Sequence, residues 1–464
     1  MKLVSIDIGS TWTKGALFQL LDDELVLLGR QACPTTVANL ADGFFHVLEQ
    51  LAGPTAEDDI RSGAVRLFYS SSAKGGLAVA ALGIVPEITL ETAKVAAYSA
   101  GAKLTSVLSY KLTRSDIKAL EAKPPDIFLF AGGTDGGNTD YVLANAQALA
   151  NSTLDCSMVY AGNRAVRDEV AELLAHKELR TVDNLLPEVD SPNPDPAREA
   201  MRSIFLEKIT KGKGLDTIIA RTGAEPLPTP YAVFEYVKCI RQHVPGWEEF
   251  ILLDMGGATT DVYSAHRESP AADTVLRGLP EPDVKRTVEG DLGMRVSAQS
   301  TAESGRALIA EALKNAPEGI AATSAFADFV NHVTLHPQTL PADAQGQAFD
   351  ALLAGACISH ACARHAGRSH QVHTADGIFN LQVGRDLRGV KRLIGSGGWL
   401  ANTPGFTPSQ WLAQQRLDAK GKSILLPTQV EYSRDAGYLF PLLANVACAF
   451  PAPAARAGIH ALSQ

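Results

Sequence analysis

The chain has 464 residues, of which 46% are hydrophobic and 20% charged, values typical of a globular protein with sizeable cores. Its length predicts about three domains, or two large ones. The formal net charge of −9 argues against a nucleic-acid-binding surface, which needs an excess of basic residues. No apolar run approaches the roughly 18 residues of a membrane-spanning helix, and the N-terminus lacks the features of a signal peptide. We therefore expect a cytoplasmic protein with neither nucleic-acid nor membrane partners.

A strand predicted over 2–8 opens the chain and ends in a tight turn that is rich in hydroxyl groups. Strands over 15–21 and 25–29 follow, and the three form a β-meander. Glycine lets backbone N–H groups approach a phosphate closely, and an aspartate at the strand end can hold Mg²⁺ through water. The residues that we expect to bind a nucleotide here are Asp7, Gly9, Ser10, Thr11 and Lys14. For Lys14 two interpretations stay open, because it either neutralises phosphate charge or is an ordinary exposed lysine.

Three further short strands, predicted over 65–69, 127–131 and 158–161, each run into a glycine-containing loop and then a helical pattern. This alternation is typical of an α/β layer with loops at the carboxyl ends of the strands. The loop at 132–137 carries Asp135, which we assign as the candidate catalytic residue that orients the attacking water or holds Mg²⁺. The alternative is an aspartate that caps the following helix.

Prolines become dense between 185 and 230, where we expect surface loops that bridge two halves of the molecule. A helix predicted over 231–243 follows. We therefore divide the chain into a first half, residues 1–245, and a second half, residues 246–464. The tail from Pro451 onward is rich in proline and alanine, and we expect it to be frayed.

The second half repeats the strand and glycine turn with which the chain begins. A strand predicted over 249–253 ends in Asp254, and a glycine turn with hydroxyl residues leads into a second strand. Two such loops facing each other would grip a triphosphate from both sides, with Asp7 and Asp254 flanking the metal. The nucleotide-binding residues that we assign to this second loop are Gly256, Gly257, Ala258, Thr259 and Thr260.

Residues from about 290 to 380 have a mainly helical pattern. A last strand, predicted over 390–394, runs into a third glycine loop, whose small residues allow close contact with a purine and ribose. The loop residues that we assign to nucleotide binding are Gly395, Ser396, Gly397 and Gly398. The roles of Glu289 and Asp291 stay open, because they either face the cleft or a partner or form a solvated pair at a helix start.

The three motifs, in this order, resemble the phosphate-1, phosphate-2 and adenosine motifs of the actin, heat-shock-chaperone and sugar-kinase superfamily. This resemblance implies an α/β protein of the actin-like ATPase (ribonuclease H-like) fold. Its duplicated domains, each with a five-stranded mixed sheet, would enclose a cleft for ATP and Mg²⁺.

More of the chain is similar to one branch, the MutL-type accessory family of glutamate mutase (methylaspartate mutase). The segments that carry this resemblance are 130–138, 287–295, 382–387 and 394–398. It implies an ATP-dependent, chaperone-like reactivating factor, which helps an adenosylcobalamin-dependent mutase to exchange damaged cobalamin. The partner would be the subunits of a mutase, in the first place glutamate mutase, and the activity a slow ATPase coupled to reactivation.

Two alternatives remain at this point. A small-molecule kinase of the same superfamily would need a carboxylate base near the γ-phosphate, and Asp135 suits either activity. A nucleotide-gated scaffold with negligible turnover is the third hypothesis.

Overall fold

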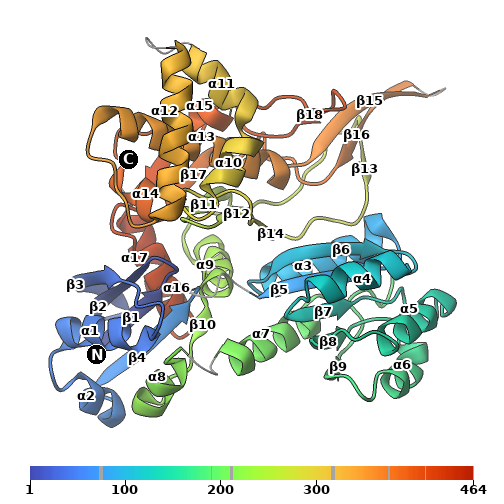
Figure 1. The fold of residues 1–464 in the computed structure, drawn as a ribbon, viewed down its shortest axis with the longest axis horizontal. Coiled ribbons are helices and arrows are strands. Elements are labelled where there is room, and N and C mark those ends of the chain that lie inside the picture. The colour runs from blue at the N-terminus through green and yellow to red at the C-terminus, as the bar shows by residue number, and fades with distance from the viewer. Residues whose placement is uncertain are drawn as a thin grey trace.

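We describe the fold from a computed structural model of the chain, which covers residues 1–72, 77–189, 191–209, 213–314, 319–374, 377–412 and 414–462 (Figure 1). The glycine-containing loop predicted after the strand at 65–69 lies partly outside these residues. Within the described part of the chain, no helix has the length and apolar character to cross a bilayer.

The first sheet has five strands in the order β10-β4-β1-β2-β3. Its strands are β1 (Lys2–Ile8), β2 (Trp12–Leu21), β3 (Glu24–Pro34), β4 (Val65–Ser71) and β10 (Leu227–Pro228). β1 pairs antiparallel with β2 and parallel with β4 in the middle of the sheet, and it is buried after its first residue because helices also pack on it. This register places Asp7 beside Lys14 on one side and Ser70 on the other.

The second sheet repeats this arrangement in the order β14-β12-β11-β17-β19. Its strands are β11 (Phe250–Met255), β12 (Thr260–Ala265), β14 (Val284–Glu289), β17 (Arg392–Ser396) and β19 (Glu431–Arg434). As in the first sheet, the central strand pairs antiparallel with the next strand and parallel with a later one. The duplicated mixed sheets confirm the predicted actin-like ATPase fold.

A third sheet is inserted between β4 and β10, and we call the unit formed by residues 77–209 the inserted domain. All its strands are parallel, in the order β6-β5-β7-β8-β9. They are β5 (Ala78–Gly83), β6 (Lys103–Ser109), β7 (Ile127–Phe130), β8 (Ser157–Tyr160) and β9 (Leu179–Thr181). The strands predicted at 127–131 and 158–161 therefore lie in a different sheet from β4, and reading them as one layer is wrong. Strand pairing depends on contacts distant in sequence, which a local pattern does not show.

Helices surround these sheets. The inserted domain carries a π-helical turn (Pro86–Leu90), α3 (Glu91–Ser99), α4 (Arg114–Ala122), α5 (Asp140–Ala150), a 3-10 turn (Arg164–Val166), α6 (Arg167–Leu173) and α7 (Asp195–Ile209). The first sheet is flanked by α1 (Leu40–Ala52), α2 (Ala56–Ser62) and α8 (Leu215–Thr222). The long helix α9 (Thr229–His243) then leads from β10 into the second half, where Figure 1 shows it between the three sheets.

The region between β14 and β17 is helical as predicted up to His365. Its helices are α10 (Ala298–Ser304), α11 (Arg306–Lys314), α12 (Gly319–Leu335) and α13 (Ala344–His365). Beyond His365 the prediction is wrong, because β15 (Arg368–Thr374) and β16 (Gly377–Val383) form an antiparallel hairpin. The hairpin joins β13 (Thr274–Arg277) and β18 (Ser423–Ile424) in a small fourth sheet that projects from the molecule, and α14 (Gly398–Asn402) and α15 (Ser409–Leu412) complete this half (Figure 1).

The end of the chain returns to the first sheet. The helices α16 (Phe440–Ala447) and α17 (Pro451–His460) pack on α9 and on β1 and β3. The Tyr236 hydroxyl donates a 2.8 Å hydrogen bond to the Ala454 carbonyl, and α17 buries several of its small residues. The expectation of a frayed tail is therefore wrong. Proline fits the first turn of a helix and alanine favours helix, so the same composition builds a packed helix once a surface is available.

Candidate functional site

The two predicted phosphate loops have the same backbone turn. In the first, the Gly9 N–H donates to the Trp12 carbonyl at 3.0 Å, and in the second the Gly256 N–H donates to the Thr259 carbonyl at 2.9 Å. Each loop joins the central strand of its sheet to the antiparallel neighbour. A Cβ at Gly9 would lie 2.7 Å from the Trp12 oxygen, so a side chain there would break the turn. The duplication of the sheets thus extends to the loops.

The structure brings all three predicted glycine motifs to one place. A Cβ added at Gly257 would lie 3.7 Å from the Thr11 methyl carbon, so the two phosphate loops face each other. The third motif begins in the last two residues of β17, which runs beside β11 and places Ser396 next to Asp254. Gly397 has φ +104° and its backbone lies so close to Met255 that a Cβ would come within 2.2 Å of the carbonyl oxygen. A Cβ at Gly398 would lie 3.8 Å from Lys14 Nζ.

Asp7 is fully buried and held by three hydroxyl groups from distant parts of the chain. Its carboxylate accepts hydrogen bonds from Ser70 at 3.0 Å, from Thr229 at 2.7 Å and from Tyr438 at 3.2 Å. These bonds fix the orientation of the carboxylate toward the loops. Sequence reasoning did not predict these contacts, because each joins Asp7 to a residue far away in the chain.

Lys14 lies among carboxylates. Its Nζ is 3.1 Å from the centroid of the Tyr438 ring, a cation–π geometry. Burial lowers the pKa of Lys14, while the charges of Asp7, Asp254 and Asp435 raise it. Asp435, which the sequence analysis did not single out, accepts a 2.9 Å hydrogen bond from Ser396 and so links Lys14 to the third motif. This environment favours a lysine that meets phosphate charge over one that is simply exposed.

Asp254 lies close to other carboxylates, whose negative charges repel its own. It stands opposite Asp261 in the register of β11 and β12. Burial, followed by the charges of Asp261 and Asp7, raises the pKa of Asp254 from 3.8 to about 7, although Lys14 opposes this shift. A cation beside Asp254 would relieve the repulsion. The acidic oxygens therefore fit Mg²⁺, which prefers hard oxygen ligands.

Asp7 and Asp254 would hold this ion through water. In the described part of the chain, no three His, Cys, Asp or Glu side chains converge closely enough to bind a metal by themselves. Mg²⁺ commonly keeps several waters and takes further ligands from substrate phosphates, so a pair of carboxylates is sufficient protein support.

The segment 287–295 wraps around the second phosphate loop. The N–H groups of Met294 and Arg295 donate to the carbonyls of Gly256 and Gly257, at 3.1 and 2.8 Å. The Arg295 guanidinium forms a buried bidentate pair with Asp350 of α13, with both N–O distances at 2.8 Å. The helical region thus supports the loop from behind.

Two other assigned loop residues have structural partners. The Thr260 hydroxyl donates to the Leu292 carbonyl at 2.9 Å, and the Ala258 carbonyl accepts from Ser297 at 2.7 Å. Thr260 is fully buried. Its hydroxyl therefore holds the loop in shape.

Glu289 and Asp291 are bound to α13. Arg364 donates to Glu289 at 2.7 Å and to both carboxylate oxygens of Asp291 at 2.7 and 2.9 Å. Glu289 ends β14, opposite Thr260. These carboxylates form an ion-paired clamp behind the second phosphate loop, an arrangement that the sequence did not suggest.

Asp135 lies in the loop that follows β7 in the inserted domain, and its hydrogen bonds are to residues of that domain and not to the three glycine loops. Its carboxylate accepts from the Arg164 N–H at 2.9 Å and from Asn184 at 2.8 Å. Packing explains the neighbouring Gly162, because a Cβ there would come within 2.4 Å of the Gly132 nitrogen. The catalytic role of Asp135 stays a prediction that these contacts do not support.

Comparisons with known proteins identify the family of the chain. The model of the MutL protein family matches residues 3–461. The chain is 34% identical, over 458 residues and 97% of each chain, to Protein MutL of Clostridium tetanomorphum. Solved structures with weaker similarity include nucleotide-free acetone carboxylase, with TM-score 0.37, 11% identity and coverage of 96% of this chain and 70% of that one. Another is nucleotide-free diol dehydratase-reactivating factor, with TM-score 0.35, 10% identity and coverage of 97% and 99%. From its sequence over nearly its whole length, the chain belongs to the MutL family.

Proposed function

We propose that this protein is an ATP-dependent reactivating factor for an adenosylcobalamin-dependent mutase, with glutamate mutase as the candidate partner. The observation that carries the proposal is the meeting of three glycine loops and two aspartates between duplicated sheets. Membership of the MutL family and the resemblance of its motifs to the glutamate mutase accessory branch support the class of partner.

Each group at the site has a part in this function. Asp7 and Asp254 would hold Mg²⁺ through water, and Lys14 would meet phosphate oxygens from the first loop. Backbone N–H groups of the two phosphate loops would donate to the same phosphates. The third loop, with Gly397 and Gly398, leaves flat backbone for the purine and ribose. Bound Mg-ATP supplies a γ-phosphate that is lost on hydrolysis.

The two phosphate loops belong to different sheets, so gripping one triphosphate draws both sheets toward each other. After the γ-phosphate is lost, the two loops have fewer phosphate oxygens to bind in common. The open arrangement of the two sheets is then favoured. A mutase bound across the moving parts would be opened and closed with each cycle. We infer a slow ATPase, because the role of the chain is to open and close its partner, and hydrolysis itself needs only a positioned water.

The experiment that tests this function is the recovery of activity from cyanocobalamin-inhibited glutamate mutase. The inactive mutase is incubated with free adenosylcobalamin and this protein, with Mg-ATP, without nucleotide or with a non-hydrolysable ATP analogue. We expect recovery only with hydrolysable Mg-ATP. The Asp7→Asn variant should fail, while Asp58→Asn, on an 82% exposed side chain of α2, should act like the natural chain.

No recovery by the natural protein, with a mutase that chemical cofactor exchange restores, would contradict glutamate mutase as the partner. Stoichiometric transfer of phosphate to a small molecule would instead establish the kinase alternative.

A further inference from the structure

Arg286, in the middle of β14, connects the ATP cleft to the inserted domain. Its side chain is only 1% exposed. On one side its Nε donates to Asp261 at 2.8 Å. On the other side its NH1 donates to the carbonyls of Tyr98, at 2.5 Å, and Ala102, at 3.4 Å. A single guanidinium thus holds a strand of the second half and the end of a helix in the inserted domain.

Tyr98 belongs to the last turn of α3, and Ala102 lies just beyond the C-cap of this helix. The C-terminal end of a helix carries partial negative charge, and the Tyr98 carbonyl accepts from Arg286 in addition to the Gly101 N–H group. The positive charge of Arg286 is therefore shared between this helix end and the Asp261 carboxylate. A change in the charge around Asp261 alters how strongly Arg286 is drawn to each.

The charge of the ATP cleft affects Arg286 through Asp261. It stands opposite Asp254 in the strand register, and Asp254 is a proposed Mg²⁺ residue. Without a cation in the cleft, Asp254 and Asp261 repel each other and both depend on nearby positive charge. With Mg²⁺ at Asp254, the cation compensates the negative charge of the two aspartates. The electrostatic attraction between Asp261 and Arg286 then changes.

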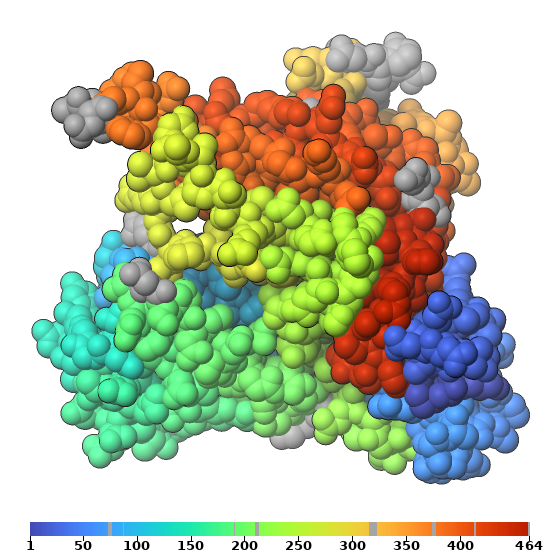
Figure 2. Space-filling model, turned by 180° about the vertical axis from the view of Figure 1, so that it is seen from behind, coloured from blue at the N-terminus to red at the C-terminus, as the bar shows by residue number. Residues whose placement is uncertain are grey.

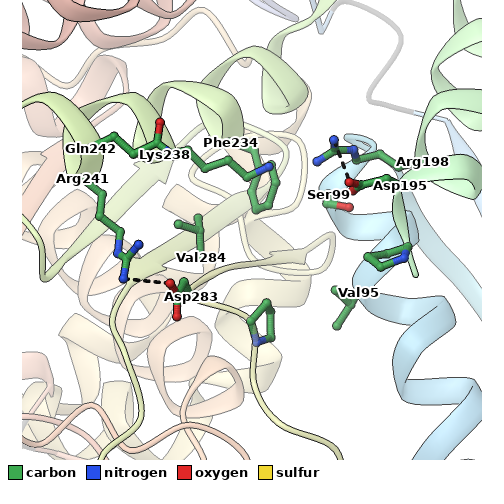
Figure 3. A pocket seen from close by; sticks show the side chains of 12 residues that line it. Val95, Ser99, Asp195, Arg198, Phe234, Lys238, Arg241, Gln242, Asp283 and Val284 are labelled. Carbon is green, nitrogen blue, oxygen red and sulfur yellow. Dashed lines mark ion pairs between the residues drawn. The ribbon is translucent and has the colours of Figure 1, made fainter. Parts of the chain in front are cut away.

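The joint between α3 and β14 has room to respond. A cavity of about 260 Å³ lies beside the contact, lined by α3, α7, α9 and the segment that enters β14. Figure 3 shows Val95 and Ser99 of α3 across open space from Phe234 and Val284. Seen from behind, a hollow lies between part of the inserted domain and the second half (Figure 2). Densely packed interfaces resist small shifts, and this one is bordered by empty volume.

We propose that Arg286 is a positioning residue that transmits the charge state of the ATP cleft to α3 and so sets the placement of the inserted domain. This rests on the proposed function in one respect, because it takes Mg-ATP as the ligand of the cleft. It assigns the inserted domain as the part that moves with the nucleotide.

The test is hydrogen–deuterium exchange of the full chain with and without saturating Mg-ATP, followed in peptides that cover residues 91–109. Calorimetry on the same samples measures Mg-ATP binding. The variants are Arg286→Met and Arg286→Lys, since a lysine ammonium is a point charge that cannot reach Asp261 and the helix end as a fork. The control is Lys103→Met, which removes the 3.3 Å hydrogen bond between Lys103 and the Gly290 carbonyl. That bond joins the same two units without contacting Asp261.

In the natural chain and in Lys103→Met, we expect Mg-ATP to change exchange over 91–109. In both Arg286 variants this change should fall by at least about half, because the charge of the cleft no longer reaches α3 through the guanidinium. Their Mg-ATP affinity should stay within about threefold of the natural chain. Arg286→Lys keeps the test valid if Arg286→Met does not fold.

An unchanged response in a folded Arg286 variant would overturn the proposal, as would its loss in Lys103→Met. A natural chain that binds Mg-ATP with no change over 91–109 would overturn it too. A natural chain that does not bind Mg-ATP would instead overturn the proposed function on which this one rests.

Discussion

Replacing Asp254 by asparagine should stabilise the nucleotide-free protein at pH 8. The pKa of Asp254 is raised from 3.8 to about 7, first by burial and then by Asp261 and Asp7. An acid with a higher pKa in the folded state binds protons more tightly there, so stability falls as the pH rises from about 4 to about 7. At about 1.4 kcal/mol per pH unit, the ionised carboxylate costs at most about 4 kcal/mol at pH 8. Because the side chain is partly exposed, we expect about 2 kcal/mol.

Denaturant unfolding of the natural chain and Asp254→Asn, at pH 8 and pH 5 without nucleotide, measures this difference. The variant should be the more stable protein at pH 8, and its advantage should shrink by more than half at pH 5, where Asp254 is protonated in the folded state. Asp58→Asn, on the exposed face of α2, should show neither effect. Asp254→Asn should also lose Mg-ATP binding. A variant that is less stable than the natural chain at pH 8, or equally changed at both pH values, would refute the electrostatic reasoning.

Further predictions concern the support of the site and the end of the chain. Arg295→Met strands the buried Asp350 carboxylate and should cost about 3–5 kcal/mol in denaturant unfolding. Arg364→Gln removes the partner of Glu289, which is 13% exposed, but Arg364 itself is 39% exposed, so the loss should be smaller, about 1–2 kcal/mol. Equal losses in the two variants would contradict this difference in burial. Deleting residues 451–464 removes the packing of α17 on α9 and should lower the melting temperature, followed by circular dichroism, by at least about 5 °C. An unchanged melting temperature would mean that the tail does not contribute to the fold.

The sequence predicts those parts of the site whose residues lie close together in the chain. Asp7, Gly9 and Thr11 lie within a few residues of each other, and the same pattern recurs at Asp254. A tight turn after a strand needs glycine at fixed positions, so the turn can be recognised from the sequence without knowledge of the rest of the fold. The duplication of that signal predicts two facing loops, and the paired sheets follow from the resemblance of the three motifs to the actin-like superfamily.

The remaining parts depend on pairing between distant segments. Ser70, Thr229 and Tyr438 converge on Asp7 from positions spread along the whole chain, and each is an unremarkable residue in its own segment. The separate sheet of the inserted domain was missed for the same reason. Local periodicity shows that a strand exists, and only the partners show which sheet it joins.

Charge pairs between distant elements were the least predictable feature. Arg286, Arg295 and Arg364 each reach a carboxylate on another element, and their spacing in sequence carries no signal of this. The segment 287–295 did attract attention through its resemblance to a family motif. The structure gives that motif a physical reason, because its backbone holds the second phosphate loop in place.

The most direct test of the composite ATP site is calorimetric titration of Mg-ATP into the natural chain and into Asp7→Asn, with circular dichroism to show that both are folded. One Mg-ATP per chain, bound only in the presence of Mg²⁺ and lost or weakened by at least about tenfold in Asp7→Asn, is the result that the structure predicts. Equal affinity in the two folded proteins, or no binding by the natural chain, would contradict the account.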